Sequence, residues 1–289
     1  MSNAQDALAI AKAAGYEIVH SLGHGSFGRT YLARRNNELF TIKVPITERG
    51  LAMLGSESAI LHTIEPQCVY HFMCLVSVLP TRPGPPQVVI SRYLEGQALS
   101  SYVPSYKKHF KGVKLSLTEI SSIATQMLTA LYVLHSLGVA HRDVKPHNII
   151  YHNGVATLID FGMATNYPRN VAGTPTFLAP EIYRYADGVV PIEVLKRSDV
   201  YGLGVTLYVL VNRQQYPFQP LIAPDSFVHF DYTKYRRSAA VGVDSSGIND
   251  LIDSMILQPQ TAHSVLGRWN VSAIPEIKYT LGPELFFPK

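Results

Sequence analysis

The chain has 289 residues, of which 47% are hydrophobic and 16% are charged, and its formal net charge is +4. The hydrophobic fraction is large enough to bury a core, which excludes a disordered chain, and typical domain lengths of roughly 100–200 residues favour two packed units or one large domain. The weak positive charge, without a long run of Lys and Arg, excludes a dedicated nucleic-acid or membrane-surface binder but allows a small anionic ligand.

The cysteines and the apolar segments indicate where the chain resides. Two cysteines, Cys68 and Cys74, are too few for a disulfide scaffold and match no zinc signature, so we expect two reduced thiols. The apolar residues 200–211 are fewer than the roughly 20 that span a membrane and predict a buried core helix. Residues 1–15 show no secretion signal and are expected to form an N-terminal extension, in which residues 1–4 resemble a cloning remnant.

The first third of the chain is predicted to consist mainly of strands. β-Branched and aromatic runs separated by Gly-rich or Asn-rich turns predict strands at residues 16–22, 30–34, 39–44, 72–79 and 87–92. Between the third and fourth strands, Leu54, Glu57, Leu61 and Ile64 recur with helical spacing, which predicts a helix over residues 51–64.

The remaining two thirds are predicted to be mainly helical. A capping box at Ser116 begins a periodic apolar segment over residues 116–137, and further helices are expected at 200–211 and 248–257. Two short apolar runs, 148–151 and 155–159, predict a hairpin. The pattern indicates an α+β fold with a small strand-rich lobe, a linker near residues 92–97 and a larger helical lobe.

A glycine-rich loop lies between the first two predicted strands. Gly23, Gly25 and Gly28 form a G-x-G-x-x-G pattern, in which the missing Cβ atoms let backbone N–H groups approach phosphate oxygens. Dinucleotide-binding folds use the same glycines, but there the loop leads into a helix, whereas here it leads into a strand. The pattern therefore predicts a phosphate-binding loop, with a plain flexible hairpin as the alternative.

A charged residue in each of two apolar elements predicts an ion pair. Lys43 lies in the middle of a strand and Glu57 lies on the apolar face of a helix. Burying either charge alone would cost several kcal/mol, so each is best explained by the other. The position of Lys43 directly after the glycine loop favours phosphate binding, with a purely structural ion pair as the alternative.

The densest polar cluster comprises residues 141–148, which read H-R-D-V-K-P-H-N. It is followed by the D-F-G motif at residues 160–162, by A-P-E at 179–181 and by S-D-V-Y-G at 198–202. With the glycine loop and Lys43, these ordered motifs resemble those of the eukaryotic-type (Hanks-type) protein kinases of the serine/threonine type, over about residues 16–257.

The resemblance implies a bilobal protein-kinase-like fold, with a small antiparallel β-sheet N-lobe (16–91), a hinge (92–97) and a mainly helical C-lobe (98–289). It implies ATP as co-substrate, with Mg²⁺ or Mn²⁺ held by Asn148 and Asp160. It assigns the nucleotide pocket to Leu22, Gly23, Gly25, Ser26, Phe27, Gly28, Thr30, Thr41, Lys43, Ser91, Tyr93, Leu94 and Ile150.

The resemblance also implies catalytic roles. Asp143 would accept the proton of the substrate hydroxyl, and Lys43, oriented by Glu57, would hold the α- and β-phosphates. Lys145 matches the lysine of serine/threonine kinases and would stabilise charge at the γ-phosphate. Thr174 matches the threonine that supports Asp143 and Lys145.

Several residues depart from the family pattern. Thr30 replaces the usual Val over the adenine, and Arg92 replaces the usual acidic hinge residue. Ser91 occupies the gatekeeper position, which is usually larger, so we expect an open pocket behind the adenine. Residues 258–262 contain no Arg to pair with Glu181, for which we expect Arg268 as a substitute partner.

The short segment 163–178 is expected to be the activation segment. Its hydroxyl residues include Thr165, Tyr167 and Thr174. Arg142 precedes Asp143 as in kinases whose segment is ordered by a phosphate that pairs with Arg, and we predict Thr165 as the phosphorylated residue. The alternative is a loop that orders itself without phosphate.

The motifs are compatible with three functions. The complete set of catalytic and metal-binding residues favours an active serine/threonine protein kinase over a pseudokinase that binds nucleotide without transfer, and the A-P-E segment disfavours a small-molecule kinase. The expected partners are protein substrates, with no direct nucleic acid, no membrane span and no metal cluster, since the histidines near the catalytic loop have no ligand spacing. We expect a soluble, cytoplasmic protein, with delivery into a host cell as an effector as an alternative.

Overall fold

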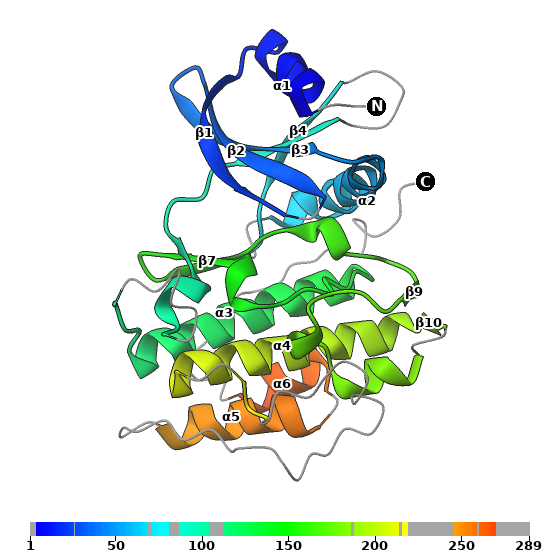
Figure 1. The fold of residues 1–289 in the computed structure, drawn as a ribbon. Helices are drawn as coiled ribbons and strands as arrows, with labels where there is room; N and C mark the ends of the chain where they lie inside the picture. Colours follow the sequence, from blue (N-terminus) through cyan, green and yellow to red (C-terminus); the bar gives the residue numbers. More distant parts are fainter. Residues whose placement is uncertain are drawn as a thin grey trace.

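The computed structural model describes residues 4–25, 27–68, 71–80, 87–104, 112–185, 188–213, 216–218, 245–258 and 260–269. The chain forms two lobes, a β-rich N-lobe and a mainly helical C-lobe (Figure 1). This arrangement confirms the predicted α+β bilobal fold.

Five antiparallel strands form the N-lobe sheet, in the order β1-β2-β3-β5-β4. Their bounds are β1 (Glu17–His24), β2 (Gly28–Arg35), β3 (Glu38–Pro45), β4 (Leu75–Leu79) and β5 (Val88–Arg92). The β2–β3 turn places Asn36 and Asn37 at positive φ, a backbone conformation that Asn tolerates in tight hairpins. In β3 the register pairs Lys43 with Thr30 on one side and with Val89 on the other.

One face of this sheet packs against α2 (Glu48–Ile64). The helix begins three residues before the predicted position because the Thr47 side chain accepts a hydrogen bond from the Gly50 N–H and caps it. The buried face of α2 includes Glu57, whose side chain is only 2% exposed. The helix therefore presents a carboxylate toward β3, as the spacing predicts.

The opposite face of the sheet packs against a helix that the sequence analysis does not predict. α1 (Ala4–Ala13) lies over the N-lobe sheet, on the side away from the C-lobe (Figure 1). Ala7 and Ala11 are fully buried and form a second core with Tyr16, Phe40 and neighbouring strand residues. The expected extension is thus part of the fold from Ala4 onward.

The C-lobe is built on α3 (Leu117–Ser136) and α4 (Ile192–Asn212), with α5 (Ser245–Leu257) and α6 (Ala262–Arg268) against them (Figure 1). The capping box predicted at Ser116 is present, since Ser116 and Glu119 exchange hydrogen bonds. By length and composition α3 could cross a membrane, but ten of its residues are buried in the C-lobe core, as in the core helix of a soluble protein.

Short strands line the C-lobe surface that faces the N-lobe. β6 (Gln97–Ala98), β7 (Ile149–His152) and β8 (Val155–Leu158) form a three-stranded sheet in this order. The β7–β8 hairpin confirms the prediction. Farther along the chain, β9 (Arg169–Asn170) pairs with β10 (Val189–Val190).

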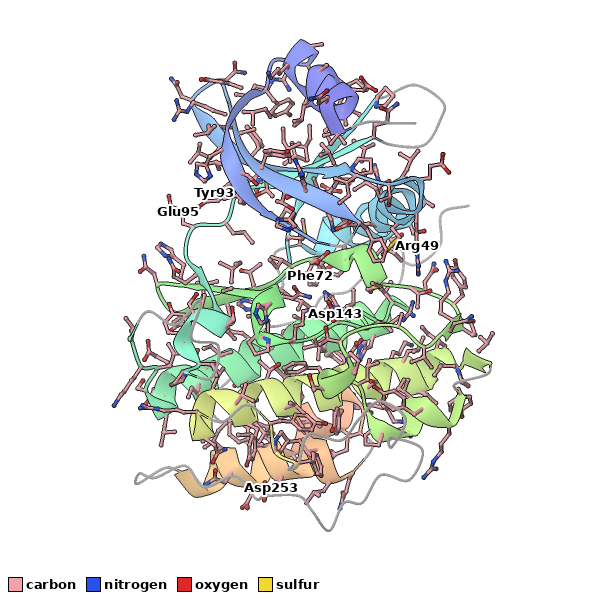
Figure 2. The ribbon with its side chains drawn as sticks, viewed as in Figure 1. Arg49, Phe72, Tyr93, Glu95, Asp143 and Asp253 are labelled. Atoms are coloured by element: carbon pink, nitrogen blue, oxygen red, sulfur yellow. A yellow bond between two sulfur atoms is a disulfide. The ribbon has the colours of Figure 1, made fainter. Side chains whose placement is uncertain are left out.

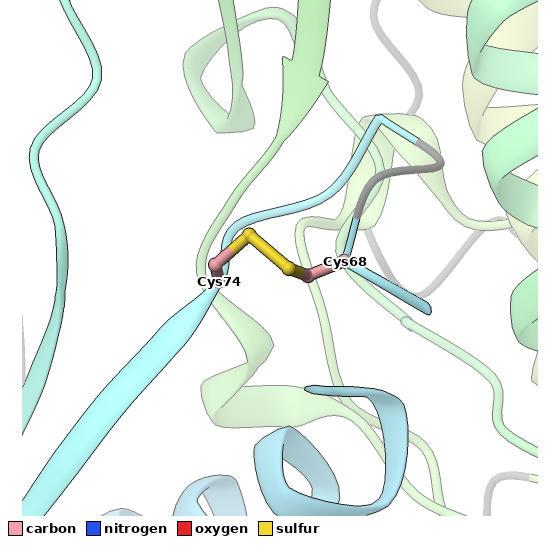
Figure 3. The surroundings of a disulfide bond; sticks show 2 residues. All are labelled: Cys68 and Cys74. Carbon is pink, nitrogen blue, oxygen red and sulfur yellow. A yellow bond between two sulfur atoms is a disulfide. The ribbon is translucent and has the colours of Figure 1, made fainter. Parts of the chain in front are cut away.

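A disulfide joins Cys68 and Cys74, so the prediction of two reduced thiols is wrong (Figure 3). Cys68 follows the one-turn 3₁₀ helix Glu65–Gln67 at the end of α2, and Cys74 directly precedes β4. The chain reverses between these elements and brings the two Cα atoms within 5.0 Å. Cysteine spacing alone does not reveal such a reversal.

The motif S-D-V-Y-G does not begin α4 as expected, because the helix starts at Ile192 and the motif lies inside it. Its Gly202 brings α4 against the catalytic region. A Cβ on Gly202 would lie 2.8 Å from the Val144 carbonyl oxygen and 3.0 Å from that of Phe177. A side chain at this position would push the helix away from two backbone segments.

We therefore expect Gly202→Ala to lower the free energy of unfolding by about 1–3 kcal/mol, because overpacking outweighs the better helix propensity of Ala. Urea denaturation measures this change. Gly188→Ala is the matched control, since a Cβ there meets no atom within 4 Å. Equal stability of the two variants would contradict the proposed close packing at Gly202.

Candidate active site

A cleft of about 630 Å³ separates the lobes. Its walls come from the glycine loop, β3, α2, the hinge, residues 143–150 and the D-F-G segment. Tyr93 lies on the hinge side of the cleft and Asp143 lies below it, in the C-lobe (Figure 2).

The structure brings the predicted pocket residues together around this cleft. The lining residues include Leu22, Gly23, Gly25, Phe27, Gly28, Thr30, Thr41, Lys43, Ser91, Tyr93, Leu94 and Ile150. Ser26 lies outside the described residues. The sequence analysis did not single out several further lining residues, which are His24, Met53, Met73, Gly96, Ile159 and Met163. His24 lies within the glycine loop, and no motif marks the others, which reach the cleft only through the packing of the lobes.

Lys43 connects three separate elements. Its Nζ lies 2.8 Å from Glu57 Oε2, on α2, and 2.7 Å from Asp160 Oδ1, in the D-F-G segment. The predicted Lys43–Glu57 ion pair is therefore present, with Asp160 as an additional carboxylate partner. The backbone N–H of Phe161 also acts on Glu57, in the direction that lowers its pKa.

The same three charges shift one another's ionisation. Burial alone would lower the pKa of Lys43, but the carboxylates of Glu57 and Asp160 outweigh it and raise this pKa above its ordinary value. Burial favours a higher pKa for Asp160, yet the nearby ammonium lowers the pKa of Asp160 to about 2. Burial raises the pKa of Glu57, and Lys43 partly offsets that rise. Lys43 and Asp160 are thus charged at neutral pH.

Asp143 is held by hydrogen bonds at both carboxylate oxygens. Oδ1 accepts from the Thr174 N–H at 3.1 Å and from its hydroxyl at 2.7 Å. Oδ2 accepts from Asn148 Nδ2 at 2.9 Å and lies 2.8 Å from Lys145 Nζ. Lys145 also donates to Thr174 Oγ1 at 2.8 Å. These contacts fix the orientation of the carboxylate at the floor of the cleft, where the resemblance places it.

A buried carboxylate of α4 supports the loop that carries Asp143. Asp199 accepts the backbone N–H groups of His141 and Arg142, both at 2.7 Å, and its Oδ2 lies 3.0 Å from His135 Nε2. Arg142 adopts a positive φ of 69°, a backbone conformation that needs such support. The sequence analysis noted Asp199 only as part of a motif and assigned it no role at the site.

The donor set suits a hard divalent cation bound together with phosphates. Asp160 is 46% exposed toward the cleft and offers carboxylate oxygens. Asn148 donates through Nδ2, which leaves its amide oxygen for a metal. Mg²⁺ prefers oxygen ligands and usually takes one or two from the protein and the rest from phosphates and water. Consistent with this, the described residues contain no group of three or more His, Cys, Asp and Glu arranged to hold a metal on their own.

The activation segment is ordered by contacts within the protein. The Arg142 guanidinium donates to the carbonyl oxygens of Met163, at 3.1 Å, and Asn170, at 2.6 Å. Thr165 is only 2% exposed, pairs with Ala140, and its hydroxyl donates to the Tyr167 carbonyl. This geometry does not support Thr165 as a phosphorylation site, because its hydroxyl is buried and Arg142 already has backbone partners.

The expected Arg268–Glu181 ion pair is not formed. Arg268 Nε instead donates to the carbonyl of Ser264, one turn earlier on α6. Within the described ranges Glu181 forms no ion pair. The prediction failed because it placed α6 relative to the A-P-E segment without a motif to define the register.

The gatekeeper prediction concerns the inner end of the cleft. Ser91 is 3% exposed and pairs with Thr41 across β5 and β3. Met53, Leu54 and Val89 line the cleft together with Ser91. The small hydroxymethyl side chain therefore leaves an apolar wall open to the cleft at this point.

Comparison with known proteins agrees with this geometry. A family model described as the protein kinase domain matches residues 16–261. Serine/threonine-protein kinase Pkn1 of Myxococcus xanthus is 30% identical over 227 residues, which cover 72% of this chain and 30% of that protein. Serine/threonine-protein kinase 36 of Pongo abelii is 29% identical over 208 residues, which cover 68% of this chain and 14% of that protein.

The chain spans less than a third of the length of either relative. Among solved structures, the kinase PK-1 of Cydia pomonella granulovirus superposes with a TM-score of 0.69 at 19% identity, covering 87% of this chain and 91% of that one. The superposition supports the bilobal fold. The chain belongs to the eukaryotic-type protein kinase family, on its serine/threonine side.

Proposed function

We propose that the chain is an ATP-dependent protein kinase that transfers the γ-phosphate to a Ser or Thr hydroxyl of a protein. The observation that carries the proposal is the joint geometry of two networks that line one cleft. Lys43, Glu57 and Asp160 form the first network. Asp143, Lys145 and Thr174 form the second.

Each network serves a different part of the transfer. The Lys43 ammonium supplies a fixed positive charge for the phosphates that enter beneath the glycine loop, and Glu57 keeps it from turning away. Asp143 holds its carboxylate toward the cleft, where it orients the substrate hydroxyl and accepts its proton. Lys145 stabilises negative charge beside that carboxylate.

The metal site completes the charge balance. Asp160 and Asn148 would hold Mg²⁺, or Mn²⁺ in its place, and the bound cation would offset phosphate charge and shield the β- and γ-phosphates from repelling the incoming oxygen. Asn148 has a second role, because its amide also donates to both the backbone and the side chain of Asp143.

The contacts of Lys145 favour Ser or Thr as the acceptor and a protein as the substrate. Lys145 and Thr174 meet at the catalytic carboxylate, the arrangement that the resemblance ascribes to serine/threonine kinases. The segment 173–181 leads from Thr174 to the A-P-E motif, and its Pro175–Phe177 turn lies against α4. This segment provides a platform beside Asp143 for an extended peptide. A pseudokinase is disfavoured because every catalytic side chain has its required partner.

A cytoplasmic location also remains a proposal. ATP as co-substrate supports it. The Cys68–Cys74 disulfide counts against it, because stable disulfides are rare in the cytosol, where those that form are usually transient and redox-sensing.

Replacing the proposed base gives the most direct test. We expect Asp143→Asn to reduce kcat for peptide phosphorylation at least about 100-fold, the size of a lost general base, while the affinity for Mg²⁺-ATP stays within about 3-fold. Radiometric peptide assays and calorimetry measure the two quantities. Asp250→Asn, an exposed acid on α5, is the control and should leave both unchanged. Full activity in Asp143→Asn would refute the assignment of the base.

The buried ion pair has an energetic signature. Lys43→Met leaves the Glu57 carboxylate buried without its cation, so we expect the free energy of unfolding to fall by about 3 kcal/mol. The double variant Lys43→Met/Glu57→Gln removes that charge and should regain part of the loss. Lys196→Met, which breaks only an i,i+3 pair on α4, should cost at most about 0.5 kcal/mol. If chemical denaturation gives Lys43→Met and Lys196→Met the same small loss in free energy of unfolding, the coupling between Lys43 and Glu57 is contradicted.

The small gatekeeper predicts tolerance of enlarged nucleotides. We expect an ATP analogue with a bulky substituent on the exocyclic amine to serve as phosphate donor, because Ser91 leaves the inner end of the cleft open. Ser91→Met should raise the KM for the analogue about 10-fold, the effect of a clash of 1–2 kcal/mol, and change the KM for ATP much less. Ser21→Met, outside the cleft, is the control. An analogue that fails equally with wild type and Ser91→Met would show that the open wall does not reach the adenine.

A further inference from the structure

The Cys68–Cys74 disulfide closes a loop that neither the fold nor the proposed chemistry requires. The loop connects the end of α2 to the start of β4, and neither cysteine lines the cleft (Figure 3). Both cysteines are only partly buried. Its position matters because α2 carries Glu57.

The residues inside this loop bind to the other lobe. The Met73 N–H donates to the Leu158 carbonyl at 3.0 Å, and the Leu158 N–H donates to the His71 carbonyl at 2.7 Å. His71 Nδ1 also lies 3.2 Å from the carbonyl oxygen of Ala156. The loop is therefore hydrogen-bonded to β8, which ends two residues before Asp160.

Phe72 provides the apolar part of the same contact. Its side chain is 1% exposed and its ring centroid lies 6.3 Å from that of Phe161, in an edge-to-face arrangement (Figure 2). Phe161 belongs to the 3₁₀ turn Phe161–Met163, which contacts α2, and its backbone N–H lowers the pKa of Glu57. A continuous series of contacts therefore connects the disulfide loop, the D-F-G segment and the α2 carboxylate that orients Lys43.

We propose that Cys68 and Cys74 form a redox modification site that controls the position of α2. A dithiol reductant of the thioredoxin or dithiothreitol class attacks one protein sulfur as a thiolate, forms a mixed disulfide with it and releases the other protein sulfur as a thiolate. The second thiol of the reductant then attacks the mixed disulfide and displaces the protein sulfur still held there. The reductant leaves as a disulfide and the protein gains two thiols, so electrons and protons balance. Reduction frees the loop ends and weakens the hold of Phe72 on Phe161, which loosens Glu57 against Lys43.

The inference uses the proposed kinase function for its activity readout, so a structural readout accompanies it. Oxidised wild type is compared with wild type reduced by dithiothreitol, and thiol alkylation followed by intact-mass measurement counts the free cysteines in each sample. Peptide phosphorylation gives kcat and the KM for ATP. Amide hydrogen exchange reports opening of residues 71–74 and 156–162.

We expect reduction to lower kcat/KM for ATP about 5-fold or more, the lower end of typical coupling between sites, and to speed exchange in both segments. Reoxidation should reverse both effects. Cys68→Ser/Cys74→Ser should behave as reduced wild type and should not respond to dithiothreitol, which controls for effects of the reductant elsewhere. If that variant does not fold, the comparison of oxidised and reduced wild-type protein is sufficient to test the proposal.

Two results would overturn the proposal. The first is that reduced wild-type protein, with both cysteines shown by alkylation to be free, keeps the kcat/KM and the hydrogen-exchange pattern of the oxidised protein. The other is a native protein whose two cysteines remain free under mild oxidants. Redox-dependent exchange in a protein that transfers no phosphate in either state would instead support the redox site and refute the proposed function.

Discussion

The geometry of the site depends on one buried cation that is shared by two carboxylates. Lys43 comes from β3, Glu57 from α2 and Asp160 from the segment after β8, so their contacts exist only while both lobes and the helix keep their relative positions. Removing a charge from water is costly, and the cost is offset here only when all three groups meet. The ion pairs thus couple the residues proposed to bind phosphate to those proposed to bind the metal. A chain with only 16% charged residues still places the Glu57 carboxylate in its interior.

Asp199 has the corresponding role in the C-lobe. Its carboxylate is nearly inaccessible and accepts two backbone N–H groups of the loop that holds Asp143. Gly202, one turn later on α4, lets the same helix approach the loop backbone at Val144. The catalytic carboxylate is therefore positioned by a rigid helix rather than by the loop alone. A reacting group held in this way needs little rearrangement when the substrate arrives, which is the physical basis of preorganised catalysis.

Features produced by interactions between residues close in sequence could be predicted from the sequence, and features produced by contacts between separate segments could not. Helices α2 and α3 are evident from apolar periodicity and caps, and the catalytic residues are evident because their chemistry demands fixed residue types at fixed spacing. The helix α1 was missed because it buries alanines, Ala7 and Ala11, which give no strong apolar stripe. The disulfide and the burial of Thr165 depend on contacts that no local pattern encodes. Arg268 bonds locally, to the carbonyl of Ser264 on its own helix, and its pairing with Glu181 was predicted without knowledge of where α6 lies relative to the A-P-E segment.

These long-range contacts change where control of the enzyme is expected to lie. In the activation segment, the Arg142 guanidinium uses the carbonyls of Met163 and Asn170 where a phosphate would otherwise be its partner. Burial lowers the pKa of Arg142 and the neighbouring Arg169 adds to this effect, while Asp199 opposes it. A segment ordered in this way gains little from an added phosphate, because the new charge would have to displace existing hydrogen bonds. A second contact near the site joins the end of α2 to the C-lobe through Phe72, inside the disulfide loop. Regulation through the position of α2 is therefore more consistent with this geometry than regulation through the activation segment.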